Sequence, residues 1–255
     1  MSDTDAEPLG LAMICLSAPA LPTVEALGSA LEALGEGPSV ENAKLEDEVL
    51  SFDFGGATAF VSLMPGPIPW EDLEGPCATA WHWEEAESVL REHKAHLIVV
   101  LTGNAGDAIE QHLRLTRLVA AAAEASEALG VYWGGAPLVQ PREAFFEVAQ
   151  EAGRDNLPLE LWVEQRLFSS APETVSVFTA GMDKLGAMEV EVREAHGDPS
   201  EVMALVYGIA QYLVLNGNVI QDGDTVGGSE EERVTARHVD SEWERAGKVL
   251  LLELE

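Results

Sequence analysis

The stretch VLSFDFGGATAFVSLM, residues 49–64, decides most of what this chain reveals about its fold. Two runs of mainly apolar residues, 49–54 and 57–64, stand on either side of Gly55 and Gly56. Glycine adopts a positive φ without steric cost, so a glycine pair between two such runs is typical of a tight β-hairpin turn. The segment therefore predicts two antiparallel strands joined at Gly55–Gly56.

Strands and helices extend the pattern on both sides of this hairpin. Apolar runs at 9–16 and 96–102 predict buried strands, and the spacing of apolar residues predicts helices over 22–34 and 84–94. The order β-α-β-β-α-β over residues 9–102 is that of the ferredoxin-like split βαβ unit. In that unit two helices cover one face of an antiparallel sheet.

The rest of the chain predicts a second half of similar character. The segment GRDNLP, residues 153–158, combines glycine, proline and polar residues and marks the expected boundary. We therefore expect an α+β protein made of two ferredoxin-like halves packed together, 9–152 and 159–255, after a flexible N-terminus at 1–8. The further expected elements are helices at 107–129, 142–152 and 198–215 and strands at 131–133, 159–168, 174–179, 187–193, 219–221 and 249–252.

Two of these elements carry expectations about burial. The strand 187–193 alternates apolar and charged residues, which predicts one buried and one exposed face. Helix 198–215 is apolar almost all round, which predicts a buried helix. In the strand, the residues expected inside are Met188, Val190 and Val192, and those expected outside are Glu189, Glu191 and Arg193.

Charge is the most pronounced feature of the composition. The 255 residues include 45 Asp and Glu against 14 Lys and Arg, a net charge of −31. Such a surface repels phosphate backbones and anionic lipids, which argues against nucleic-acid and membrane binding. It either serves solubility or presents an acidic face to a basic partner protein. Charge alone leaves both interpretations open.

Features that the sequence lacks bear on where the protein is located. No apolar run approaches the roughly 20 residues of a membrane span, and the acidic residues before 9–16 are unlike a signal peptide. We therefore expect a cytoplasmic protein.

Cys15 and Cys77 are too few and too far apart to indicate a metal site or a disulfide framework. No catalytic or cofactor motif is recognisable, which favours a protein that is not an enzyme and holds no cofactor or metal.

Two segments are candidate binding sites. In QDGDTVGG, residues 221–228, the carboxylates of Asp222 and Asp224 and the hydroxyl of Thr225 suit a hard cation or small ligand, or simply close a tight turn. The cluster of Trp81, His82 and Trp83 is typical of a binding surface, since tryptophan is enriched at interface hot spots, or of a lid over the core.

From about residue 159 onward the chain resembles a bacterial family known as domain of unknown function 4261. The resemblance rests on LELWV at 159–163, TAGM at 179–182 with Leu185-Gly186, and EVEV at 189–192. It continues with Tyr212-Leu213, Asn216-Gly217 and DGDTVG at 222–227. The family has no established activity, so the resemblance implies no catalytic residue.

Three functional hypotheses follow. The first is a non-enzymatic binding protein that docks onto a basic partner, by analogy with small acidic immunity or adaptor proteins of bacteria. The second is a metal- or ligand-binding enzyme or sensor centred on Asp222, Asp224 and Thr225. The third is a structural protein that self-associates.

Overall fold

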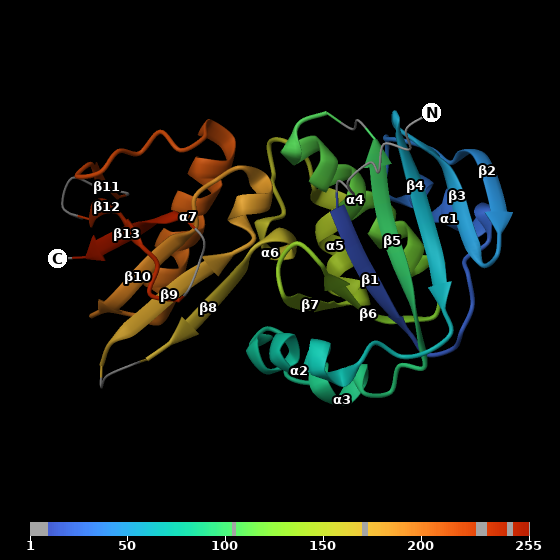
Figure 1. Cartoon of the computed structure of the whole chain (residues 1–255), viewed down its shortest axis with the longest axis horizontal. Helices are drawn as coiled ribbons and strands as arrows, with labels where there is room; N and C mark the ends of the chain where they lie inside the picture. The colour runs from blue at the N-terminus through green and yellow to red at the C-terminus, as the bar shows by residue number, and fades with distance from the viewer. Residues whose placement is uncertain (1–9, 104–105, 170–172, 228–233, 244–246, 255) are drawn as a thin grey trace. The chain divides into compact units, whose positions relative to one another are not determined.

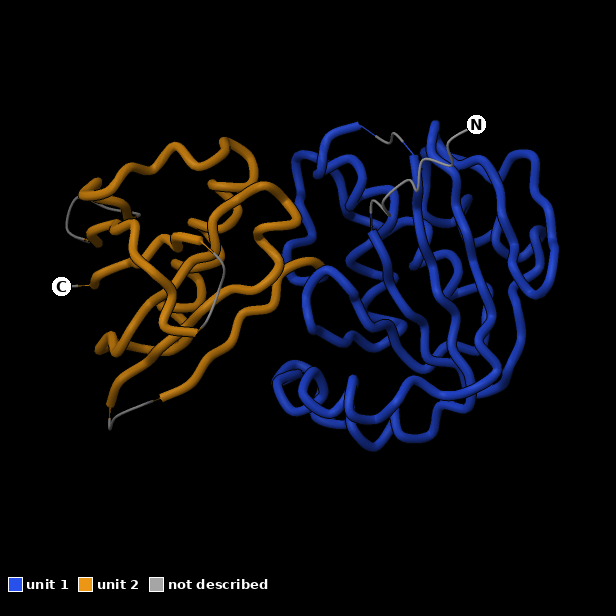
Figure 2. The backbone as a smooth tube through the Cα atoms, in the orientation of Figure 1, with its two compact units in different colours: residues 1–161 blue, residues 162–255 orange. Residues whose placement is uncertain are grey.

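A computed structural model describes residues 10–103, 106–169, 173–227, 234–243 and 247–254. It contains helices and two open sheets, so the predicted α+β class is confirmed (Figure 1). The chain divides into two compact units, residues 1–161 and 162–255 (Figure 2). The expected flexible N-terminus, residues 1–8, lies outside the described residues.

Unit 1 is built on a seven-stranded sheet in which every neighbouring pair is antiparallel. The predicted hairpin is confirmed: Phe54 pairs with Ala57 across Gly55 and Gly56, whose φ values of 58° and 87° need glycine. The strands, in their order across the sheet, are β2 (Glu41–Glu46), β3 (Val49–Phe54), β4 (Ala57–Met64), β5 (Ala95–Gly103), β1 (Gly10–Leu16), β6 (Ala128–Trp133) and β7 (Leu138–Pro141).

Helices lie on both faces of this sheet. The long helix α4 (Ala108–Glu124) packs against β1, β5 and β6, between α1 (Val24–Ala33) and α5 (Arg142–Glu151). On the other face, α2 (Trp70–Thr79) and α3 (Ala86–Leu90) pack at the β6–β7 end. Alternation along β1 separates the two layers, since Cys15 joins the α2–α3 cluster while its neighbours Ile14 and Leu16 point the other way.

The ferredoxin-like strand order is wrong. That order would place 10–16 between 57–64 and 95–103, whereas β5 lies between β4 and β1 and pairs with both. The segment between β4 and β5 holds only a ten-residue and a five-residue helix, and these pack near β6 and β7. With no long crossover helix between them, β4 and β5 pair directly as antiparallel neighbours.

Unit 2 holds a six-stranded sheet with one helix of 18 residues. The helix α7 (Pro199–Asn216) packs against β8, β9 and β10. One neighbouring pair, β10 and β13, is parallel, with Val190 opposite Leu250. The strands across the sheet are β11 (Thr225–Val226), β12 (Val234–Asp240), β13 (Lys248–Leu254), β10 (Val190–Ala195), β9 (Val175–Ala180) and β8 (Glu164–Phe168). The unit also contains the 3₁₀ helix η1 (Met182–Leu185), and the short helix α6 (Leu159–Trp162) spans the boundary between the units.

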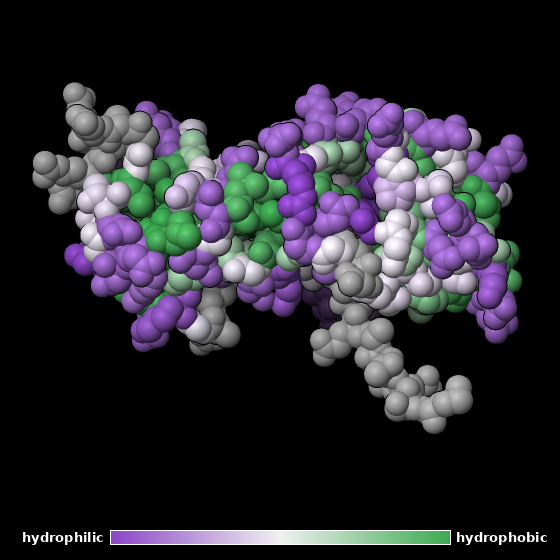
Figure 3. Space-filling view, turned by 90° about the horizontal axis from the view of Figure 1, so that it is seen from above, coloured by the Kyte–Doolittle hydropathy of each residue, from purple (hydrophilic) through white to green (hydrophobic). Residues whose placement is uncertain are grey.

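Three sequence expectations in this part of the chain are wrong. Residues 159–168 are not one strand, because the first four form α6 and the strand begins at Glu164. Residues 219–221 form no strand. Helix α7 is buried on one face only: Tyr212 and Leu215 remain about half exposed (47% and 49%). Figure 3 shows hydrophobic residues, in green, reaching the surface over unit 2.

The exposed face predicted from the alternation along 187–193 is also wrong. Val190 and Val192 are buried as expected, but Glu189 is only 9% exposed and Glu191 is fully buried. The carboxylates escape water because hydroxyl, guanidinium and backbone donors surround them inside unit 2. Charge normally indicates the solvent face of a strand, and here it indicates a polar cluster inside the fold.

Candidate functional site

The segment between α2 and α3 presents Trp81 to solvent. Its side chain is 70% exposed, the highest value among the exposed large hydrophobic residues that the structure describes. The two residues that follow anchor the segment. The His82 Nε2 atom lies 3.1 Å from the Val139 carbonyl oxygen of β7, and Trp83 is buried in the α2–α3 core cluster. The predicted cluster therefore divides into one presented side chain and two that hold it in place.

Trp83 reaches its position because β6 has a glycine beneath it. A Cβ atom built on Gly130 would lie 2.7 Å from the ring of Trp83 and 3.0 Å from the Gln140 carbonyl oxygen. Such distances are too short for any side chain, so the ring packs directly on the backbone of the strand. This contact fixes the backbone at Trp83, and the His82 ring stands edge-on to Trp81 at 5.7 Å.

Acidic residues flank Trp81 in the sequence, and their side chains are exposed. Residues 70–91 contain six carboxylates and one Lys or Arg, a net charge of −5. That cation, Arg91, forms an ion pair with Glu87 and stacks over the Trp70 ring at 3.8 Å. The exposed carboxylates are those of Glu71, Asp72, Glu74, Glu84, Glu85 and Glu87. An exposed aromatic ring within an acidic segment combines an apolar anchor with a field that attracts cations.

The acidic turn of unit 2 uses its side chains to hold backbone. Asp222 Oδ1 accepts a hydrogen bond from the backbone N–H of His238 at 2.9 Å, and Asp224 Oδ2 accepts one from the N–H of Gln221 at 2.8 Å. Between them Gly223 has a φ of 90°, and Thr225 begins β11 opposite Thr235. Within the described residues, no group of three or more His, Cys, Asp or Glu side chains is placed to hold a metal ion.

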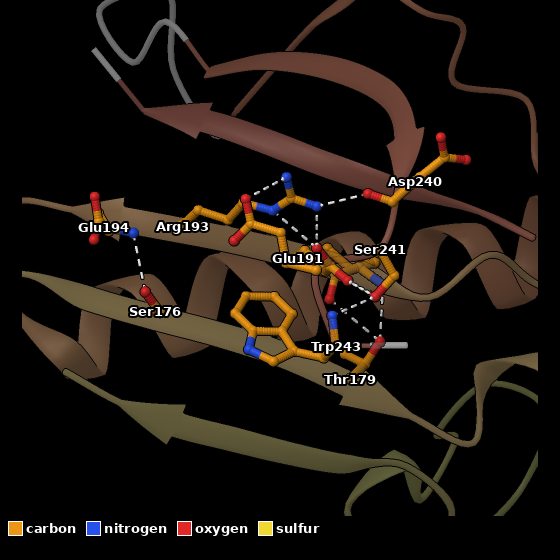
Figure 4. Close-up of polar contacts among 10 residues, drawn as sticks. Ser176, Thr179, Glu191, Arg193, Glu194, Asp240, Ser241 and Trp243 are labelled. Carbon is orange, nitrogen blue, oxygen red and sulfur yellow. Dashed lines mark hydrogen bonds and ion pairs between the residues drawn. The ribbon is translucent and has the colours of Figure 1, made fainter. Parts of the chain in front are cut away.

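The sequence pattern missed a buried ionic cluster centred on Glu191 of β10 (Figure 4). Glu191 Oε2 accepts hydrogen bonds from Arg193 Nη2 at 2.6 Å and Nε at 3.0 Å, and its Oε1 accepts one from the Ser241 hydroxyl. Arg193 also donates to the Asp240 carbonyl oxygen at 2.9 Å and to Glu242 Oε1 at 3.1 Å. The cluster therefore fastens the segment after β12 onto the sheet.

An aromatic group closes this cluster on one side. Trp243 stacks on Phe178 with ring centroids 4.8 Å apart and stands edge-on to Phe168 at 5.3 Å. The guanidinium carbon of Arg193 lies 5.9 Å from the centre of the Trp243 ring. In the same cluster, the Trp243 backbone N–H donates to the Ser241 hydroxyl oxygen at 3.0 Å. These contacts lower the local dielectric around the Glu191–Arg193 pair and strengthen it.

Glu189 serves a second buried polar cluster. Its Oε1 accepts the backbone N–H groups of Gly181 at 2.9 Å and Met182 at 3.1 Å, and its Oε2 accepts the Thr179 hydroxyl at 2.6 Å. The carboxylate thus caps the N-terminus of η1, whose free N–H groups have no partner within the helix. Nearby, Asn218 Oδ1 accepts the Met188 N–H at 2.8 Å. These residues stabilise backbone rather than form an open catalytic centre.

A cavity of about 340 Å³ lies where the parallel strands β10 and β13 end. Its lining combines Arg193 and His196 with the carboxylates of Glu194 and Glu253. Arg193 is held by Glu191, and Glu253 Oε2 accepts a bond from Arg237 Nε at 3.1 Å. A cavity whose main charges already have partners offers no strong complement to one type of ion.

The cysteines of unit 1 are buried and not nucleophilic. Burial raises the pKa of the Cys15 thiol to about 12 and that of Cys77 to about 11. Both side chains belong to the core cluster beneath α2 and α3. Because the thiolate is the reactive form, neither residue is activated at neutral pH.

Residues 178–253 match a family model. Its description is "Domain of unknown function (DUF4261)", and the match lies within unit 2. No match to this chain was found among curated proteins or solved structures. The family resemblance in the C-terminal part of the sequence is therefore confirmed. Several of the residues that carry it, including Gly181, Glu189 and Asp222, hold the backbone of unit 2.

Proposed function

We propose that this chain is a non-enzymatic cytoplasmic binding protein, of an immunity or adaptor type, that captures a basic partner protein. Trp81 carries the proposal, because a large aromatic side chain that is 70% exposed is costly in water and useful in an interface. Its neighbours supply the anchored backbone and the acidic surroundings. The partner presents an apolar pocket for the ring and Lys or Arg side chains around it.

The distribution of ion pairs supports the proposal. Twelve Lys and Arg residues lie in the described part of the chain, and nine of them pair with the chain's own carboxylates. Those pairs engage ten carboxylates, against 37 Asp and Glu in the same described residues. The chain therefore neutralises its cations and leaves a large excess of acidic groups for an external partner. No helix in the described part of the chain is long and apolar enough to cross a membrane.

Association kinetics test the proposal. A partner captured from the native cell and identified by mass spectrometry should associate rapidly at low salt and markedly more slowly in 0.5 M salt, roughly tenfold or more. The dissociation rate should change less, because buried contacts set it. An association rate indifferent to salt would mean that the acidic surface serves solubility only.

A matched pair of variants tests the anchor. Trp81→Ala should raise the dissociation rate tenfold or more, since truncation of an aromatic hot spot removes roughly 2 kcal/mol or more of binding energy. Tyr212→Ala, at a half-exposed aromatic residue of unit 2, should leave the rate unchanged. Equal effects of the two substitutions would sink the assignment of Trp81.

A further inference from the structure

One face of the unit 1 sheet is only partly covered. Along β5, Leu97, Val99 and Leu101 are fully buried, whereas Ile98 and Val100 between them stay partly exposed. Figure 1 shows α1, α4 and α5 on one side of the strands, and α2 and α3 at one end of the other side. Within the described residues, the second side of β3, β4 and β5 thus carries no helical layer.

The partly exposed face is apolar at its centre. Residues paired across antiparallel strands share a face, and the register places Leu11 of β1 opposite Val100 and Val100 opposite Phe60 of β4. In the next row, Met13 lies opposite Ile98. We call these five residues the open-face stripe. A sheet face turned to water normally carries polar residues, so an apolar stripe there indicates a surface that another molecule covers.

Acidic groups border the open-face stripe on its β2–β3 side. Toward the β2–β3 edge, the face carries Asp53, with Glu41 opposite it, and Glu46 opposite Val49. One cation shares this face, because Lys44 lies opposite Ser51, which itself lies opposite Phe60. Strands β1, β3, β4 and β5 contain no Lys or Arg. On the other side, Met13 packs against the hydrophobic α2–α3 cluster. The helices of this cluster belong to residues 70–91, whose net charge is −5.

We propose that the open-face stripe docks a cationic amphipathic helix of the partner protein. Its apolar side lies over Leu11, Val100 and Phe60, and its Lys and Arg side chains reach the carboxylates at the β2–β3 edge. The dimensions agree: strands about 4.8 Å apart make β1, β5 and β4 about 10 Å wide, close to the diameter of a helix. A second copy of this chain is the poorer occupant, because two molecules of charge −31 repel each other.

This inference rests on the proposed function, and a peptide probe separates the two. The probe is an 18-residue Lys/Leu peptide whose leucines form one helical face. The control peptide has the same composition, with the leucines scattered around the helix. Titration calorimetry on the full chain should show the amphipathic peptide binding at least tenfold more tightly than the control.

Substitutions in the open-face stripe test whether the amphipathic peptide binds to the sheet. Phe60→Thr and Val100→Thr place a β-branched strand former at each position, so the sheet should persist, as circular dichroism would verify. Each should weaken binding of the amphipathic peptide by about fivefold or more, because part of the buried apolar area is lost. Leu167→Thr, at an exposed leucine of β8, should leave binding unchanged.

The peptide measurements distinguish the helix-docking surface from the proposed capture of a basic partner. Equal binding of the two peptides, weakened by salt, would overturn the helix-docking surface and leave the acidic capture of a basic partner standing. Failure of both peptides to bind would count against both proposals. Tighter binding of the amphipathic peptide that Phe60→Thr and Val100→Thr leave intact would place the site elsewhere. A dimer in sedimentation that Phe60→Thr dissociates would assign the stripe to a second copy of the chain.

Discussion

The two units of this chain differ in where they place their carboxylates. Unit 1 keeps its carboxylates on the surface, over a core of alanine, leucine and aromatic residues, and exposes Trp81 among them. Unit 2 buries Glu164, Glu189 and Glu191. A buried carboxylate holds structure, because its hydrogen-bond capacity is used inside the fold. A surplus of exposed carboxylates creates an electrostatic field that attracts cationic groups at a distance. Under the proposed function, recognition therefore belongs to unit 1, whereas the residues of unit 2 that match the family model hold its backbone.

The largest expected effect comes from removing half of the buried ion pair. Arg193→Leu leaves Glu191 buried without its cation, which should lower the free energy of unfolding by about 3–5 kcal/mol. The matched control is Arg237→Leu at the exposed Arg237–Glu253 pair, which should cost less than about 1 kcal/mol. Urea unfolding followed by circular dichroism measures both. Similar losses in the two variants would contradict the contrast between buried and exposed charge.

The second effect separates the two tryptophans of unit 1. Trp83→Ala removes a buried ring from the α2–α3 cluster and should cost about 3 kcal/mol. Trp81→Ala removes an exposed ring and should change stability by less than about 0.5 kcal/mol. The same unfolding experiment compares them. A large loss of stability in Trp81→Ala would make this residue part of the fold and withdraw it from the proposed interface.

The third effect concerns the acidic turn of unit 2. Asp224→Ala removes the acceptor for the Gln221 N–H and should cost about 1–2 kcal/mol. Calcium, magnesium or manganese should leave the melting temperature of the wild-type chain unchanged. A rise of several degrees with any of them would show a bound cation, since a ligand that binds only the native state stabilises it. The metal-binding alternative would then replace the structural account.

Local patterns in the sequence predicted individual elements better than their arrangement. The Gly55–Gly56 hairpin follows from backbone conformation, which two residues determine by themselves. The order of the strands depends on what lies between them, and α2, which contains Pro76, shows little helical pattern. Strand β2, with the sequence ENAKLE, shows no alternation because both its faces are exposed.

The candidate sites show the same contrast between what local sequence patterns predict and what depends on distant residues. Trp81 and Trp83 are chemically equivalent in the sequence, and the buried one is distinguished by its packing on Gly130, 47 residues later. The Glu191 cluster draws Ser241 from 50 residues away, so alternation within 187–193 could not reveal it. One local signal was present: Glu191 and Arg193 stand two apart, the spacing at which side chains of a strand share a face.

The smallest expected effect is a dependence of unit 1 stability on pH. His112 of α4 is buried beside Trp133, and burial lowers the pKa of its imidazole although the Ala108 carbonyl oxygen, 2.8 Å from Nδ1, favours the charged form. The unfolded chain then binds a proton more readily than the folded one. The contribution to stability is complete above the unfolded pKa of about 6.5 and falls as the pH drops through the folded value. Because one proton is involved, the slope cannot exceed about 1.4 kcal/mol per pH unit.

A variant isolates this contribution from the rest of the chain. His112→Phe keeps an aromatic ring in the core and removes the titrating group. We expect the free energy of unfolding of the wild type, relative to this variant, to decline as the pH falls from 7 to 5. Most surface carboxylates protonate near pH 4, and their effect cancels in the difference. Parallel urea titrations at each pH measure it. A difference that stays constant with pH would show that His112 accepts its proton as readily in the folded chain as in the unfolded one.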